Sequence, residues 1–382
     1  MIPYGRQEIT EEDVRAVCEA LRSEWLTQGP AVPSFEQAVA ATCDAQYAVA
    51  VNSATSALHI ACMALDVGPG DWVWTSANTF LASANCARYC GAEVDFVDID
   101  PRTYNLSHEA LAEKLTRAQA QGRLPKVVIA VHFAGQSCEM REIKVLGERF
   151  GFRIIEDASH AVGGSYLGEP VGTCRYSDIA VFSFHPVKLI TTAEGGMALT
   201  NDATLAARME RYRSHGMTRD PELMEGPSDG PWYYQQIELG YNYRLTDVQA
   251  MLGLSQLQRL SNYVARRHAI ARRYGEQLAA LPLVRPYQSP NSRSALHLYP
   301  VQVADVRQRR HVFEGLRAAG VGVGVHYIPV HLQPYYRRRG HDVGECPHAE
   351  AYYERAVSLP MFPALNEAQQ DYVVTALGEL LR

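Results

Sequence analysis

The amino-acid sequence predicts an α/β protein, with a large domain built on a mainly parallel sheet and a smaller α+β domain after it. From about residue 47, short apolar runs alternate with helical patterns, which is typical of parallel strands joined by crossover helices. A chain of 382 residues also exceeds one domain at roughly 100–200 residues per domain. We therefore expect a large domain over residues 1–257 and a small domain over residues 258–382.

The strands expected in the large domain are short apolar runs, and most of them are followed by a helical pattern. In order, they are AVAVN at residue 48, WVWTS at 72, EVDFVDI at 93, KVVIAVHF at 126, RIIED at 153, DIAVFSF at 178 and GGMALT at 195. A helix is predicted after the last run, over residues 203–214.

The small domain is predicted from a second change of pattern. Apolar residues at helical spacing over residues 246–260 indicate a long helix that leads out of the large domain. Strands are expected at 295–303 and 321–327, with a helix at 307–319 between them. Helices near 347–355 and 366–381 complete the prediction.

Composition and charge exclude several classes of protein. The net charge of −6 gives no general attraction to nucleic acid. No run approaches the roughly 18 apolar residues of a membrane span. The acidic N-terminal segment does not resemble an export signal, so we expect a cytoplasmic protein. The basic run at residues 337–339 is interpreted as a solvated loop, or alternatively as a contact to an anionic substrate.

The eight cysteines are scattered and contain no C-x-x-C pair, which favours buried thiols over disulfides or metal ligands. Cys86 and Cys90 share one face of a predicted helix. No His or second Cys pair stands nearby, so we predict no metal site.

Ligands in such sheets bind beyond the carboxyl ends of the strands, so the loops there are the place to look for a site. After the first strand, residues 52–58 form a small polar turn that begins a helix. Its backbone N–H groups and the hydroxyls of Thr55 and Ser56 can hold a phosphate. Ser and Thr are also common helix caps, so this turn alone leaves both interpretations open.

The strand RIIED ends in two carboxylates, Glu156 and Asp157. Strand alternation points them to opposite faces, so only one can face a site. We expect that one to be Asp157, with a structural role in capping the next turn as the alternative.

A lysine, Lys188, stands in the loop after the strand at residues 178–184. Desolvation there would lower its pKa and free a neutral amine to attack a carbonyl. Ser183 would add a hydroxyl to the phosphate site, and the pair Gly195-Gly196 permits close backbone approach. Taken alone, such a residue is usually an ordinary surface lysine, so the combination of loops matters.

The fourth loop, Gly-Tyr-Asn-Tyr-Arg at residues 240–244, lies directly before a predicted helix. Its cluster of Tyr and Arg indicates either anion recognition or a buried loop anchor. In this order, the four motifs resemble the DegT-type sugar aminotransferases, a family of fold-type I enzymes that use pyridoxal phosphate (PLP). The resemblance covers essentially the whole chain, with one departure at Ala54, where many relatives have Gly.

The resemblance implies PLP as the cofactor, with Lys188 as the catalytic residue that binds it covalently. Asp157 would pair with the ring nitrogen, His160 would lie near the ring and Phe80 would stack on its face. The phosphate would be held by Thr55, Ser56 and Ser183, and by Asn242 from the second subunit of a homodimer.

The resemblance is strongest to aminotransferases of the pseudaminic acid pathway. It implies amination at C4 of a UDP-linked 2-acetamido-2,6-dideoxy-4-hexulose, with glutamate as donor. The residues assigned to the substrate are Thr27, His326, Tyr327 and His331.

These assignments have alternatives. The turn around Thr27 can instead be an ordinary Gly-Pro turn between two helices. His326 and His331 can be ordinary loop residues at a domain interface. The sugar can be another nucleotide keto-sugar aminated at C3 or C4. A dehydratase on this fold would lack Lys188, and a non-catalytic binding or regulatory protein would normally have lost Asp157 or Lys188.

Overall fold

The computed structural model describes residues 1–382, and its centre is a seven-stranded sheet. Six of the strands are parallel, and β9 alone runs antiparallel to its two neighbours. The predicted mainly parallel sheet is therefore confirmed. In spatial order the strands are β1 (Tyr47–Val51), β9 (Gly196–Thr200), β8 (Ile179–Ser183), β5 (Arg153–Asp157), β4 (Val127–Val131), β2 (Trp72–Ser76) and β3 (Glu93–Val97).

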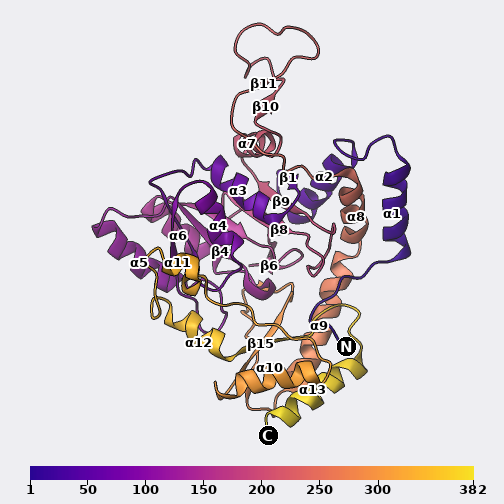
Figure 1. Ribbon diagram of the computed structural model, residues 1–382, viewed down its shortest axis with the longest axis vertical. Coiled ribbons are helices and arrows are strands. Elements are labelled where there is room, and N and C mark those ends of the chain that lie inside the picture. Colours follow the sequence, from indigo (N-terminus) through magenta and orange to yellow (C-terminus); the bar gives the residue numbers. More distant parts are fainter.

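Helices cover both faces of this sheet, and the buried clusters show which helix lies on which face (Figure 1). On one face, α3 (Ala54–Ala64), α4 (Ala82–Tyr89) and α7 (Ala203–Arg213) pack against alternate strand residues. The opposite face is covered by α2 (Ala31–Cys43), α5 (His108–Ala120), α6 (Met140–Phe150) and α8 (Asp247–Leu257). A sheet buried on both faces explains why its strands read as continuous apolar runs.

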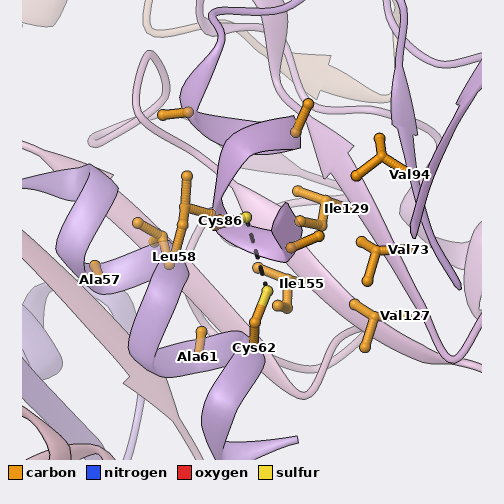
Figure 2. Close-up of a cluster of buried hydrophobic side chains, with 14 of the residues drawn as sticks. Ala57, Leu58, Ala61, Cys62, Val73, Cys86, Val94, Val127, Ile129 and Ile155 are labelled. Carbon is orange, nitrogen blue, oxygen red and sulfur yellow. Dashed lines mark hydrogen bonds between the residues drawn. The ribbon is translucent and has the colours of Figure 1, made fainter. Parts of the chain in front are cut away.

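Figure 2 shows the first of these faces, where α3 and α4 meet the valines and isoleucines of β2 to β5. Cys62 on α3 and Cys86 on α4 lie fully buried with their sulfur atoms 3.7 Å apart. Cys90 is partly exposed at the end of α4. No group of three His, Cys, Asp or Glu side chains in the chain could hold a metal ion.

The small domain has its own core around a three-stranded antiparallel sheet, ordered β12 (Leu283–Val284), β14 (Tyr299–Val303) and β15 (Ala356–Leu359). Its helices are α9 (Leu260–Gln277), α10 (Gln308–Ala318) and α13 (Glu367–Leu380). The N-terminal residues join it, since Ile2 N donates to Gly320 O and Gly322 N donates to Ile2 O.

A segment of the C-terminal part returns to the large domain. Val330, Tyr336, Ala349 and Tyr352 are buried in the same cluster as α3 and α4. They belong to η2 (Val330–Leu332), α11 (Pro334–Arg337) and α12 (Pro347–Arg355). The domain boundary near residue 258 stays a prediction. In the structure, the N-terminal residues join the small domain, and a segment of the C-terminal part returns to the large domain.

Two predicted elements differ from the structure. The expected strand at 321–327 does not form, because Val321 and Gly324 make only isolated bridges, to Ile2 and Ser358. The expected helix at 246–260 ends at Leu257, and α9 begins three residues later at Leu260.

The remaining elements are short or lie at the periphery. A hairpin of β10 (Met217–Thr218) and β11 (Gln235–Gln236) projects beyond α7 at the top of Figure 1. None of the helices combines the length and apolar character that a membrane crossing demands. The others are α1 (Glu11–Arg22), η1 (Phe133–Gly135), β6 (Ser165–Tyr166), β7 (Glu169–Pro170) and β13 (Ser292–Arg293).

Candidate active site

Strand β5 delivers its two terminal carboxylates to opposite faces of the sheet, as alternation requires. Asp157 is buried and accepts hydrogen bonds from Ser83 Oγ (2.6 Å) and from the backbone N–H of Ser159 (3.2 Å). Glu156 instead accepts from His132 Nε2 (2.7 Å) and Ser177 Oγ (2.6 Å). Only Asp157 therefore has its charge on the side of the sheet where Lys188 lies.

Lys188 lies in the loop between β8 and β9, which backbone hydrogen bonds fold back on itself. Phe184 N donates to Gly195 O, and Thr192 N donates to Phe184 O. Burial lowers the pKa of Lys188 to about 8, while the nearby charge of Asp157 opposes the shift. The amine is therefore largely neutral a short way above neutral pH, as a nucleophile requires.

This lowered pKa predicts how the stability of the cofactor-free protein depends on pH. An unfolded Lys has a pKa of about 10.4, so between pH 8 and that value the unfolded chain holds a proton that the folded chain lacks. The free energy of unfolding should rise through this window by about 3 kcal/mol relative to a Lys188→Met variant. Urea unfolding of both proteins at several pH values measures the difference, and parallel curves would contradict the shift.

The polar turn after β1 begins helix α3, and its hydroxyls face one another. Ser56 Oγ donates to Asn52 Oδ1 (2.7 Å), and Ser56 N donates to Ser53 Oγ (3.1 Å). Ser183 ends β8 directly opposite Gly196, which pairs on its other side with Val51. The turn, with Thr55 and Ser56, and the hydroxyl of Ser183 thus lie on either side of Gly196.

Gly196 is the residue that lets these two segments approach. A Cβ there would lie 2.4 Å from both Ser53 C and Ala54 N, which are rigid backbone atoms. We expect Gly196→Ala to lower the free energy of unfolding by about 3 kcal/mol, because the turn must shift. Denaturant titration measures this. Gly68→Ala, where nothing lies within 4 Å, should change it by less than about 0.5 kcal/mol.

Three histidines and a tyrosine surround the amine of Lys188. His160 Nε2 and the hydroxyl of Tyr327 lie 3.2 Å apart. Burial lowers the pKa of His160 well below its usual value, and the charges of Lys188 and His326 add to the effect. Burial and Lys188 lower the pKa of His326 to about 4. The His160 ring also lies 4.4 Å from that of His297, so these imidazoles are neutral at pH 7.

Asn78, which follows β2, fixes the loop that carries Tyr327. Its Oδ1 accepts from Tyr327 N (3.1 Å), and its Nδ2 donates to Tyr104 O (3.3 Å). Burial, with Asp157 close by, raises the pKa of Tyr327, so its hydroxyl stays protonated.

The predicted residues Phe80 and Thr27 are both exposed. Phe80 is 58% exposed with its ring centroid 6.2 Å from that of Tyr327, so it borders the site with a free face. Thr27 forms an isolated bridge with Thr246 at the start of α8.

His331 does not join the other predicted residues, and its assignment to the substrate is wrong in position. Its side chain is fully buried, and Nε2 is bonded to Glu350 on α12 (2.9 Å). The contact ties η2 to α12 within the crossing segment, because a buried imidazole needs a polar partner and finds one there.

The loop at residues 240–244 runs along the end of β1, where Asn52 N donates to Tyr243 O (2.8 Å). The rings of Tyr241 and Tyr243 stack 4.9 Å apart, and both contact His59. Asn242, between them, is exposed and points the other way by alternation. The two half-buried tyrosines therefore anchor the loop, and the side chain of Asn242 is exposed.

Two residues of the site escaped the sequence analysis. Ser83 links Thr79 to Asp157 through hydroxyl contacts of 2.7 and 2.6 Å, and Asn78 holds Tyr327. Thr79 and Ser83 are spaced by one helical turn in the sequence, and this spacing was the only local feature that indicated their contact.

The assembled residues fit PLP by their own chemistry. A half-buried amine with a lowered pKa lies near a buried carboxylate, and a hydroxyl-bearing helix start approaches closely at Gly196. These are the groups that a carbonyl, a ring nitrogen and a phosphate need.

Comparison with known proteins gives a consistent result. The family model for the DegT/DnrJ/EryC1/StrS aminotransferases matches residues 7–378. The spore coat polysaccharide biosynthesis protein SpsC of Bacillus subtilis is 38% identical over 387 residues, covering 100% of this chain and 97% of SpsC.

Two solved structures resemble the whole fold. PseC of Helicobacter pylori, an aminotransferase involved in pseudaminic acid biosynthesis, has a TM-score of 0.92 and 28% identity, covering 100% of this chain and 99% of its own. Spr1654 of Streptococcus pneumoniae, assigned as a sugar aminotransferase, was solved in PMP and PLP forms. Its PMP form has a TM-score of 0.91 and 30% identity, covering 100% and 99% of the two chains.

Proposed function

The chain belongs to the DegT/DnrJ/EryC1/StrS aminotransferase family, and from that premise we propose that it aminates C4 of a UDP-linked 2-acetamido-2,6-dideoxy-4-hexulose with glutamate as donor. The chain is a PLP-dependent sugar aminotransferase. The proposal of this particular sugar and carbon is supported by the similarity to PseC over the full length of both chains.

A second candidate is a C3 or C4 aminotransferase for another nucleotide keto-sugar. The higher identity to SpsC, 38% against 28% for PseC, favours it, since SpsC is named for a spore coat polysaccharide. A non-catalytic protein on this fold is disfavoured, because Lys188 and Asp157 are both present and lie close together.

The proposed roles follow from position. Lys188 binds the cofactor and moves the proton, and Asp157 pairs with the ring nitrogen. Phe80 would stack on one face of the cofactor ring. His160, which contacts Tyr327, would lie near the ring. Thr55, Ser56 and Ser183 would hold the phosphate group, with Asn242 of a second subunit.

The bound cofactor supplies a ring that accepts electrons and carries the amino group between donor and acceptor. Lys188 Nζ takes a proton from the α-carbon of glutamate and returns a proton to C4 of the sugar in the second half of the reaction. Hydrogen bonds from Ser83 and Ser159 hold the carboxylate of Asp157 in position. The hydroxyl of Tyr327, the neutral imidazole of His326 and the hydroxyl of Thr27 are placed to bind the sugar.

The test is to supply the purified holoenzyme with glutamate and a panel of UDP-linked and dTDP-linked 3-keto and 4-keto sugars. Mass spectrometry and NMR of the products identify the sugar and the carbon that is aminated. We expect C4 amination of the UDP-linked 2-acetamido sugar at the highest kcat/KM. A preference for a dTDP-linked or a 3-keto sugar would reject this substrate and support the second candidate.

We also propose that the active unit is a homodimer, because Asn242 is exposed and the family resemblance assigns it to the phosphate of a neighbouring subunit. Inactive Lys188→Ala and Asn242→Ala subunits, once exchange is verified with tags, should recover activity on mixing. With equal mixing and random pairing, half of the dimers are mixed, and each has one site with both intact residues. Recovery should therefore approach about a quarter of wild-type activity per subunit if sites act independently. No recovery despite exchange would place Asn242 at its own chain's site.

A further inference from the structure

A cavity lies on the outer side of the small domain. It shares no lining residue with the site around Lys188.

The volume of this cavity is about 880 Å³. That volume lies within the range of about 300–1,000 Å³ that is usual for small-molecule sites. One wall is the outer side of α9, and the opposite wall is the chain from Leu283 to Ser294.

The floor of the cavity is apolar and aromatic, and its rim is basic. Leu283, Leu296 and Tyr299 form the floor. Tyr287 stands at the edge and is 36% exposed, with the guanidinium of Arg102 over one face of its ring. Arg272, Arg285 and Arg293 line the rim, and no Asp or Glu lines the cavity. The lining therefore carries three positive charges with no negative charge among them.

These arginines differ from their neighbour Arg273, which pairs with Asp371 and Glu367 on α13. Arg272 and Arg293 form no ion pair, and both lie close enough to His268 to add to the lowering of its pKa that burial causes. Arg285 donates to the carbonyl of Gly275 and lies near the hydroxyl of Tyr299. Guanidinium groups that line one cavity without a carboxylate attract anions, and a bound anion balances their charge.

We propose that this cavity binds a nucleoside diphosphate, with the base on the apolar floor beside Tyr287 and the phosphates between Arg272 and Arg293. A planar guanidinium binds phosphate oxygens in a bidentate manner, and an aromatic ring stacks on a base. An apolar floor with a basic rim matches both halves of such a ligand. This proposal does not depend on which sugar the enzyme aminates.

The test is a fluorescence titration of the holoenzyme with N-methylanthraniloyl-ADP, compared with the double variant Arg272→Gln/Arg293→Gln. We expect the double variant to bind at least about tenfold more weakly, because two charged phosphate contacts are lost. The matched control is Arg310→Gln/Arg317→Gln on α10, which removes the same charge from the same domain and should bind as the wild type does. Equal affinity in all three proteins would overturn the proposal.

Two further arms define the ligand and the site. Unlabelled ADP should displace the probe at least about tenfold better than either adenosine or inorganic pyrophosphate, since each of these lacks one half of the ligand. Displacement by pyrophosphate as effective as that by ADP would overturn the role of the apolar floor. The Lys188→Ala variant should retain the Arg272-dependent binding, and loss of that binding would place the probe at the active site instead.

Discussion

Replacing Lys188 with Ala should abolish covalent retention of the cofactor and reduce turnover by at least about 10³-fold, because one amine is both the anchor and the proton carrier. Its lowered pKa comes from its burial in the loop after β8. Borohydride reduction followed by peptide mass spectrometry should find the cofactor on Lys188 in the wild type and on no lysine in the variant.

A matched control is Lys144→Ala, which removes a lysine whose Nζ donates only to the carbonyl of Arg175. This variant should keep the covalent cofactor and the wild-type turnover. If Lys188→Ala retained the reducible bond and its activity, the assignment of Lys188 would be wrong.

The neighbouring carboxylates at the end of β5 should separate turnover from stability. Asp157→Asn keeps the shape of the side chain but removes its charge, so we expect kcat to fall by about 10²-fold to 10³-fold with the fold retained. Glu156→Ala should leave kcat within about fivefold. It should lower the free energy of unfolding by about 3 kcal/mol, since the buried donors His132 and Ser177 lose their acceptor.

Steady-state kinetics and urea unfolding on the same preparations measure both effects. Equal losses of kcat in the two variants would reject the choice of Asp157 over Glu156. A Glu156→Ala protein as stable as the wild type would show that His132 and Ser177 find other partners.

The strands of the large sheet could be predicted because each is buried on both faces and so reads as an apolar run. The strand at residues 321–327 was predicted wrongly, because its sequence pattern is that of a strand but it has no strand to pair with. Its alternating Val and Gly match a period of two, yet its neighbours Ile2 and Ser358 offer only single bridges. Strand β15 was missed, because its four residues follow α12 directly with no turn signal between them.

For the site, the sequence could place residues whose loop follows a strand, because parallel strands bring those loops to one edge. It could not find contacts that join distant segments. Ser83 and Asp157 lie 74 residues apart, and no local pattern links them. His331 was misplaced for the same reason, since its partner Glu350 lies on a different helix, 19 residues further along.

The pairing of Ile2 with Gly320 and Gly322 bears on how the protein is made. Ile2 cannot reach these partners until residue 322 has been made, so the small domain completes late in synthesis. The same N-terminal segment borders the candidate site, since the ring of Tyr4 lies 5.6 Å from that of His326. A peptide fused before Met1 would therefore emerge close to that site.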